Sequence, residues 1–124
     1  MKIRAAVLAD VQSIAEIYNE VLRTTNAIYR EEEVDLADRE KWFNQRIEFG
    51  FPVIVAELDG GVVGYGAFNE FRYGEGYNGT VENSLHVKST ARGNGIGSAI
   101  LKVLLEIAKA QNRKIMVAGI DSEN

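Results

Sequence analysis

The chain has 124 residues, 46% hydrophobic and 26% charged, a composition typical of one globular domain spanning residues 1–124. Eighteen acidic against fourteen basic residues give a net charge of −4, the wrong sign for a general nucleic-acid binder. The lack of cysteine excludes a disulfide scaffold, a thiolate metal site and a cysteine nucleophile, and the single histidine excludes a histidine-rich metal site. No segment has the pattern of a signal peptide or a membrane span, so we expect a cytoplasmic protein.

The N-terminal part of the chain predicts one strand and one helix. Residues 1–7 alternate between two faces in the manner of a short half-buried strand. Asp10 can cap a helix that runs to about Arg23. The apolar stripe of this helix, at helical spacing, consists of Ile14, Ile17, Tyr18, Val21 and Leu22.

A second helix is predicted from Asp35 or Asp38 up to Gly50, where the following Pro52 prevents its continuation. Its aromatic and aliphatic residues recur at helical spacing, so we assign them to the core. They are Trp42, Phe43, Ile47 and Phe49.

After the second helix the hydrophobic period changes to that of strands. Residues 53–56 and 62–68 are predicted to form a hairpin through Asp59-Gly60-Gly61. Residues 69–79 form a loop rich in aromatics and glycine, and residues 80–87 form a third strand.

The C-terminal part predicts a helix over residues 98–111 and a nearly all-apolar strand over residues 114–120. The buried side of this helix is assigned to Ile100, Leu101, Leu104, Leu105 and Ala108. A hairpin followed by a right-handed βαβ crossover predicts an α/β fold, with a mixed β-sheet flanked by helices.

The most informative stretch is the glycine turn Arg92-Gly93-Asn94-Gly95-Ile96-Gly97, between a strand and a helix. Alternate glycines allow unusual backbone angles, and the amides at the start of the helix suit a phosphate or pyrophosphate. Arg92 and Lys88 add positive charge at the rim. A P-loop is excluded because Gly97-Ser98 lacks the lysine that this motif needs.

A dinucleotide-binding domain is the alternative interpretation of the glycine turn. Gly93-Asn94-Gly95 could form the first half of its fingerprint, with Asp121 as the acid that binds ribose. Residues 88–92 separate the strand from these glycines, however, and a hairpin precedes that strand, both of which count against this interpretation.

The segment Ala91-Arg92-Gly93-Asn94-Gly95-Ile96-Gly97 resembles the acetyl-CoA-binding signature of the GNAT acetyltransferases. Residues 14–19, Thr80-Val81-Glu82-Asn83-Ser84 and residues 116–120 resemble the branch of phosphinothricin and methionine sulfone (sulfoximine) N-acetyltransferases, so the resemblance covers essentially the whole chain. It implies acetyl-CoA as co-substrate and no metal. The cofactor residues that it implies are Leu85, His86 and Val87 beside the pantetheine arm, Arg92, Gly93, Asn94, Gly95, Ile96, Gly97 and Ser98 around the pyrophosphate, and Asn124.

Acetyl transfer to an amine needs a group that removes a proton. Strand alternation places Glu82 on one face with Ser84 and His86, and spacing alone leaves a solvated carboxylate as open as a catalytic one. The resemblance implies that Glu82 is the general base, and we expect His86 to be a surface residue that contributes only its backbone. The predicted wall for a small amino acceptor consists of Arg72, Tyr73, Glu75, Gly76 and Tyr77, in which Arg72 could hold an acidic group.

The branch that the chain resembles continues beyond the position of Asn124 with another helix and further strands. We therefore expect a shortened form of a longer acetyltransferase, or a chain whose last strand a partner subunit covers, and the resemblance implies a homodimer. Three functions stay open at this point: an N-acetyltransferase, a module that binds CoA without turnover, and a dinucleotide-binding domain.

Overall fold

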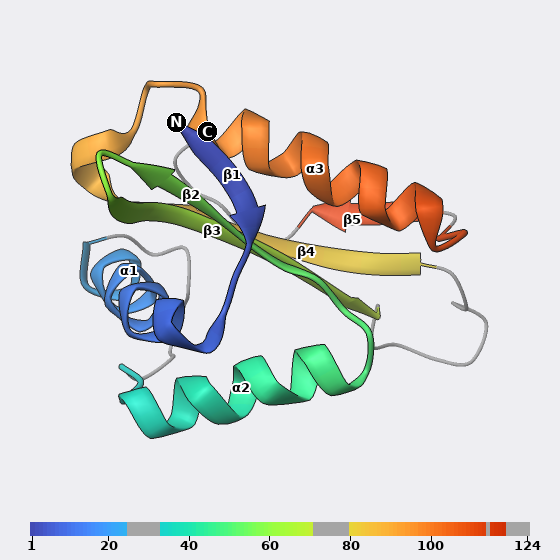
Figure 1. Cartoon of the computed structure of the whole chain (residues 1–124), viewed down its shortest axis with the longest axis horizontal. Coiled ribbons are helices and arrows are strands. Elements are labelled where there is room, and N and C mark those ends of the chain that lie inside the picture. The colour runs from blue at the N-terminus through green and yellow to red at the C-terminus, as the bar shows by residue number, and fades with distance from the viewer. Residues whose placement is uncertain (25–32, 71–79, 114, 119–124) are drawn as a thin grey trace.

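The computed structural model describes residues 1–24, 33–70, 80–113 and 115–118, and for residues 70, 80–82 and 115–118 it describes the backbone only. Its elements follow the predicted order, strand, two helices, three strands, helix and strand (Figure 1). They are β1 (Lys2–Ala5), α1 (Val11–Thr24), α2 (Leu36–Glu48), β2 (Val53–Leu58), β3 (Gly61–Glu70), β4 (Thr80–Val87), α3 (Ile96–Ala110) and β5 (Ile115–Ala118). Short 3-10 turns precede α1 at Leu8–Asp10 and follow β4 at Ser89–Ala91.

The strands form one sheet in the order β1-β2-β3-β4-β5. The first four strands are antiparallel, and β5 runs parallel to β4 after the crossover through α3. The turn between β2 and β3 has positive φ at Asp59 (52°) and Gly60 (83°). A two-residue hairpin turn needs these angles to match the right-handed twist of the two strands. The mixed sheet and its hairpin are therefore confirmed.

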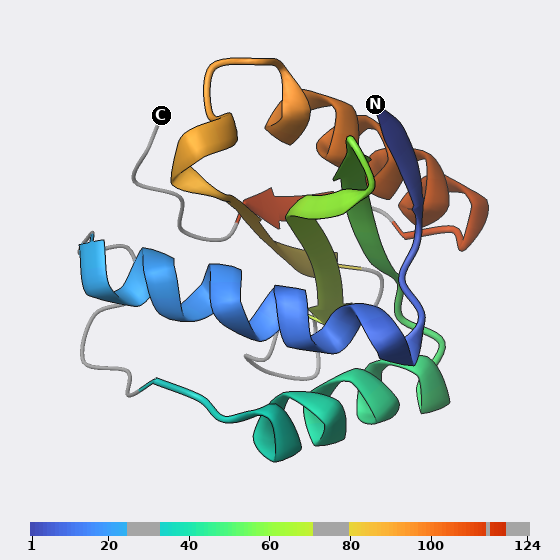
Figure 2. The ribbon, with the colours of Figure 1, turned by 60° about the vertical axis from the view of Figure 1, so that its left-hand side comes forward.

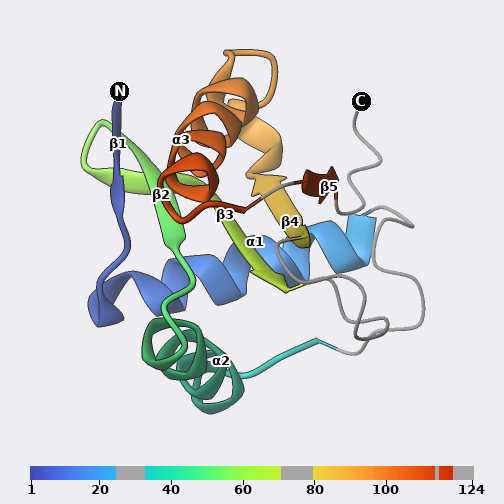
Figure 3. The ribbon, with the colours of Figure 1, turned by 90° about the vertical axis from the view of Figure 1, so that its right-hand side faces the viewer.

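The helices cover the two faces of the sheet unequally. Helices α1 and α2 lie on one face and α3 on the other, as Figures 1, 2 and 3 show from three sides. The core is divided accordingly. On the side of α1 and α2 it contains Ala6, Val11, Ile14, Ile17, Phe43, Val53, Val55, Tyr65 and Ala67. On the side of α3 it contains Ile54, Ala56, Phe68, Ala91, Ile96, Ile100, Leu104 and Ala108.

Three residues assigned to the core are exposed in the structure. Ile47 is 52%, Phe49 67% and Leu105 47% exposed. In α2 the buried residues are Arg39 and Phe43, so Ile47 near its C-terminal end and Phe49 just after it fall outside the buried row. In α3 the buried row repeats every four residues, and Leu105 lies about 100° around the helix from Leu104.

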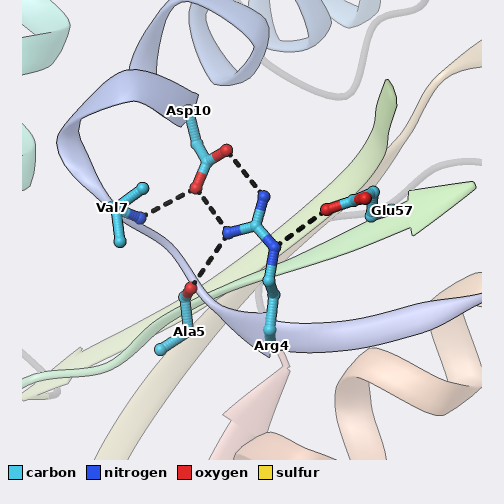
Figure 4. A network of polar contacts seen from close by, with 5 residues as sticks. All are labelled: Arg4, Ala5, Val7, Asp10 and Glu57. Atoms are coloured by element: carbon cyan, nitrogen blue, oxygen red, sulfur yellow. Dashed lines mark hydrogen bonds and ion pairs between the residues drawn. The ribbon is translucent and has the colours of Figure 1, made fainter. Parts of the chain in front are cut away.

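Asp10 does not cap α1 in the way that we predicted. Its carboxylate instead accepts hydrogen bonds from Arg4, at 2.8 Å from Nη1 and 2.9 Å from Nη2, and from the Val7 backbone N–H at 2.8 Å (Figure 4). Arg4 also donates through Nε to Glu57 at 3.0 Å and through Nη1 to the Ala5 carbonyl at 3.2 Å. One arginine on the first strand thus ties together β1, β2 and the start of the first helix.

The Arg4–Asp10 pair generates a stability prediction. Replacing Asp10→Asn leaves the Arg4 charge partly uncompensated, and we expect the free energy of unfolding at pH 7 to fall by about 2 kcal/mol. The hydrogen bonds from Arg4 lower the pKa of Asp10 against the opposing effect of burial. The contribution of this carboxylate is therefore present at neutral pH and is lost as the pH falls through the lowered pKa.

Denaturant unfolding of wild type and Asp10→Asn at pH 7 and at about pH 2 measures this difference. The exposed Asp59, in the hairpin turn, gives the control Asp59→Asn, which should change stability by less than about 0.5 kcal/mol. A deficit of the same size at both pH values would show that the charge of Asp10 is not what stabilises the fold.

Glycines on β3 let α3 approach the sheet closely. A Cβ added at Gly66 would lie 2.6 Å from Cγ2 of Ile100 and 2.9 Å from Cδ1 of Leu85. At Gly64 it would lie 3.2 Å from Cγ2 of Ile96. The packing distance between helix and sheet therefore depends on the absence of side chains at these two positions.

We expect Gly66→Ala to destabilise the protein by about 1–3 kcal/mol, because the added methyl group must displace side chains of α3 and β4. Gly61→Ala is the matched control, since its Cβ would meet only the Leu58 carbonyl oxygen, at 3.9 Å. Denaturant titration of both variants measures the difference, and equal stability of the two would contradict the close-packing explanation.

Candidate functional site

A groove of about 370 Å³ lies where the end of β4, the glycine turn and the start of α3 meet. Most of the predicted cofactor residues line it. They are Leu85, Val87, Arg92, Gly93, Gly95, Ile96, Gly97 and Ser98, joined by Ala91 and Leu101. The structure thus brings to one place residues from a strand, a turn and a helix.

The start of α3 presents backbone amides to this groove. The residue that precedes the helix is Gly95, which offers no side chain to cap it. The first helical hydrogen bond runs from the Ala99 N–H to the Gly95 carbonyl at 3.1 Å, so the amides of residues 96–98 precede the hydrogen-bonded ladder. These amides and the positive end of the helix dipole suit a phosphate group.

Backbone angles explain the glycines of the turn. Gly93 has φ 86° and Gly95 has φ 76°, whereas a Cβ at either position would meet no atom within 4 Å. Glycine is therefore required here by the backbone conformation and not by a lack of space for a side chain. Asn94 supports the turn, because its Nδ2 donates a hydrogen bond to the Ala91 carbonyl at 3.0 Å.

Polar contacts fix the turn to the neighbouring elements. Arg92 donates through Nε to the Val87 carbonyl at 3.1 Å and lines the groove, as predicted for a charge at its rim. Lys88 does not line this groove. Glu20 of α1 accepts hydrogen bonds from Ser89, at 2.9 Å from the backbone N–H and 2.8 Å from Oγ. Burial tends to raise the pKa of Glu20, but these two bonds together with the charges of Arg92 and Lys88 lower it overall, so the carboxylate is ionised at neutral pH.

His86 is buried and not a surface residue, which corrects our expectation. It is 5% exposed, and its ring centre lies 5.6 Å from that of Tyr65 and 6.3 Å from that of Tyr18. The side chains of β4 alternate, so Leu85 and Val87 line the groove while His86 faces α1. The side chain of His86 therefore lies outside the groove, and its backbone contribution stays a prediction.

A second cavity, of about 320 Å³, lies on the face of the sheet that α1 and α2 cover. Its lining includes Ser84 and His86 of β4 and two arginines of α2, Arg39 and Arg46. Sequence analysis missed these arginines. The only available signal was that they recur at helical spacing around Trp42, in a row otherwise assigned to the core.

The predicted base is placed by its backbone alone. Glu82 pairs with Asn69 of β3 and with Val117 of β5. The predicted acceptor wall, Arg72, Tyr73, Glu75, Gly76 and Tyr77, and the predicted cofactor residue Asn124 lie outside the described residues. Their roles stay predictions.

The described part of the chain holds no group of three or more His, Asp or Glu side chains that could bind a metal ion. None of its helices is long and apolar enough to cross a membrane.

A mixed sheet with a glycine turn at a helix start defines the class, an α/β protein with a groove whose amides suit a phosphate. Comparison with known proteins gives the family. Residues 12–124 match the acetyltransferase (GNAT) family. The chain is 44% identical over 123 residues to an L-methionine sulfoximine/L-methionine sulfone acetyltransferase of Pseudomonas aeruginosa, covering 98% of this chain and 72% of that protein. The chain belongs to the GNAT family and is an acetyltransferase.

Two further relatives agree with this assignment. An L-amino acid N-acyltransferase of Escherichia coli is 41% identical over 124 residues, which cover 100% of this chain and 72% of that protein. The structure of a GNAT superfamily phosphinothricin acetyltransferase from Sinorhizobium meliloti, in complex with acetyl-CoA, superposes with a TM-score of 0.92 at 35% identity, covering 99% of this chain and 67% of that one.

The turn geometry predicts that Gly95→Ala weakens acetyl-CoA binding by about tenfold, because a side chain disfavours positive φ and moves the amides that face the phosphate. Gly60→Ala is a matched control, since Gly60 also has positive φ and open space but lies in the β2–β3 turn. Both variants should lose about 1 kcal/mol of stability. Calorimetric titration with acetyl-CoA separates them, and equal affinities would contradict a role of the turn in binding.

Proposed function

We propose that the protein moves the acetyl group of acetyl-CoA to the amino group of a small amino acid of the methionine sulfone, methionine sulfoximine or phosphinothricin type. The observation that carries this proposal is the groove at the glycine turn, where unpaired helix amides and Arg92 face one space. The acceptor class is supported by the activities after which the relatives are named.

The pairing along β4 supports a place for the pantetheine arm. β5 pairs with Thr80 to Asn83, the first half of β4. In the described part of the chain no strand pairs with the same edge at residues 84–87, where the groove begins. The Val87 carbonyl at this edge accepts from Arg92, and the edge as a whole could pair with an extended ligand in the manner of an added strand. The pyrophosphate would then lie at the start of α3.

In the proposed reaction the acceptor nitrogen attacks the thioester carbonyl carbon directly. Glu82 removes a proton from the ammonium group, directly or through a water, so that the nitrogen has a free electron pair. A C–N bond forms, the C–S bond breaks and CoA leaves as its thiolate, while the second proton of the nitrogen passes to this thiolate or to water. Backbone N–H groups of β4 would stabilise the negative charge that develops on the carbonyl oxygen. No covalent enzyme intermediate is required, in keeping with a chain that has no cysteine.

The dinucleotide-binding alternative is not retained. Such domains have mostly parallel sheets, whereas β1 to β4 are antiparallel here. A module that binds CoA without turnover is an outcome of the following experiment. The cytoplasmic location, the homodimer and the single domain stay predictions.

We expect Glu82→Gln to lower kcat for L-methionine sulfone by about 10²- to 10⁴-fold, since the amide cannot accept the proton. The affinity for acetyl-CoA, measured by calorimetry, should be nearly unchanged. The deficit should shrink as the pH rises towards the pKa of the acceptor's ammonium group, because free amine then needs no base.

Glu106→Gln, the same chemical change on the exposed face of α3, is a control that leaves β4 and the glycine turn intact. An unchanged rate in Glu82→Gln would show that another group is the base. Acetyl-CoA binding by the wild type without transfer to any amino acid would favour the binding module.

A further inference from the structure

Two arginines of α2, Arg39 and Arg46, lie at the wall of the cavity between this helix, α1 and the sheet. The guanidinium carbon of Arg39 lies 4.4 Å from the centre of the Tyr18 ring and 4.6 Å from that of the Trp42 ring. The guanidinium carbon of Arg46 lies 5.3 Å from the Trp42 ring centre. The aromatic rings thus hold two cations next to each other and limit their side-chain freedom.

One nitrogen of each guanidinium group lacks the hydrogen-bond partner that a buried polar atom requires. Arg39 is 9% exposed, and the Nε atoms of Arg39 and Arg46 are both buried without a hydrogen-bond partner. The ion pairs among the described residues involve Arg4 and Arg23 instead. Burial lowers the pKa of Arg46 and the charge of Arg39 lowers it further, yet a guanidinium stays protonated at neutral pH. The cavity therefore carries positive charge that nothing in its described wall neutralises.

A carboxylate suits this wall. Its two oxygens accept hydrogen bonds from planar guanidinium groups, and its negative charge offsets theirs. We propose that Arg39 and Arg46 bind the carboxylate of the amino-acid acceptor, an inference that rests on the proposed function. The volume of about 320 Å³ is that of a small-molecule site. The rest of the lining is mainly aromatic or polar: Tyr18, Trp42, Tyr65, Ala67, Asn69, Ser84 and His86.

The place of this cavity beside β4 also fits an acceptor. Asn69 and Ser84 both line the cavity, and both lie near Glu82. Asn69 pairs with the backbone of Glu82 across the ladder, and Ser84 follows Glu82 by two positions, about 7 Å along the strand. An α-amino acid carries its carboxylate on the carbon that bears the amino group, so a carboxylate subsite must lie near the base. The groove opens on the other face of β4, so donor and acceptor would approach this strand from opposite faces.

The competing explanation is that the two arginines only pack α2 against Tyr18 and Trp42. The two explanations differ in what a carboxylate does. A carboxylate subsite distinguishes an amino acid from its neutral carboxamide, whereas a packing role affects both acceptors equally. Comparing L-methionine sulfone with L-methionine sulfone carboxamide therefore isolates the proposed contact.

We expect Arg46→Gln to lower kcat/KM for L-methionine sulfone by about 10- to 100-fold, mainly through KM, and to change that for the carboxamide by less than about threefold. Arg39 is more buried, so Arg39→Lys, which keeps the charge but loses the planar hydrogen-bonding geometry, is used together with Arg39→Gln. Lysine should retain more of the preference for the acid than glutamine does.

Arg113→Gln is the matched control. Arg113 also lies over an aromatic ring, 5.2 Å from the centre of Phe51, but it follows the C-terminal end of α3 and does not line the cavity. This variant should leave kcat/KM unchanged for both acceptors. Far-ultraviolet circular dichroism and acetyl-CoA titration of every variant verify the fold and the donor site independently of turnover.

An equal loss of rate with acid and carboxamide, or no loss with either, would overturn the carboxylate subsite while leaving acetyl transfer intact. If the wild type acetylates no amino acid, the proposed function fails. Calorimetric titration with L-methionine sulfone then tests the carboxylate subsite independently of turnover. Binding that Arg46→Gln weakens and Arg113→Gln does not would support the subsite, and absence of binding would overturn it.

Discussion

The close contact of α3 with β3 is the constraint on which the groove depends. Because Gly64 and Gly66 carry no side chains, Ile96 and Ile100 can pack directly against the sheet. This contact sets the height of α3 above the strands. At that height Gly97 lies in ordinary van der Waals range of β4, since a Cβ there would be 3.5 Å from Cδ2 of Leu85. The amides at the start of the helix consequently face the same space as the edge of β4, and a phosphate and an extended arm can be bound side by side.

Alternation along β4 separates two chemical environments with one strand. Leu85 and Val87 make an apolar wall for the groove, whereas Ser84 and His86 face a cavity with arginines and aromatic rings. In the proposed reaction this separation suits a donor with a long, partly apolar arm and an acceptor with charged groups. A shift of one residue in the pairing of β4 would exchange the two walls. The seven paired positions between β3 and β4, from Gly64–Val87 to Glu70–Val81, hold that register.

What the sequence predicted well depends on local chemistry. The hairpin turn at Asp59-Gly60, the extent of β4 and the positive φ of Gly95 follow from residue types within a few positions of each other. What it missed depends on distant partners. Asp10 looked like a helix cap because its neighbours in sequence suit one, but the Arg4 guanidinium occupies its carboxylate. The burial of His86 is decided by Tyr18 and Tyr65, which reach it from other elements.

Arg4 and Arg39 show why the second cavity is better explained by a ligand than by packing. Arg4, which is part-buried, has two carboxylates, on Asp10 and Glu57, and a backbone carbonyl, so folding itself supplies every partner that its charge needs. Arg39 is more deeply buried and lies over two aromatic faces, which attract the cation but accept no hydrogen bond in the plane of the guanidinium, and its Nε is buried without an acceptor. Desolvating a cation without hydrogen-bond acceptors destabilises the fold, so leucine or methionine would serve packing better at that position. A guanidinium there is useful to the protein when an anion enters the cavity and supplies the missing acceptors.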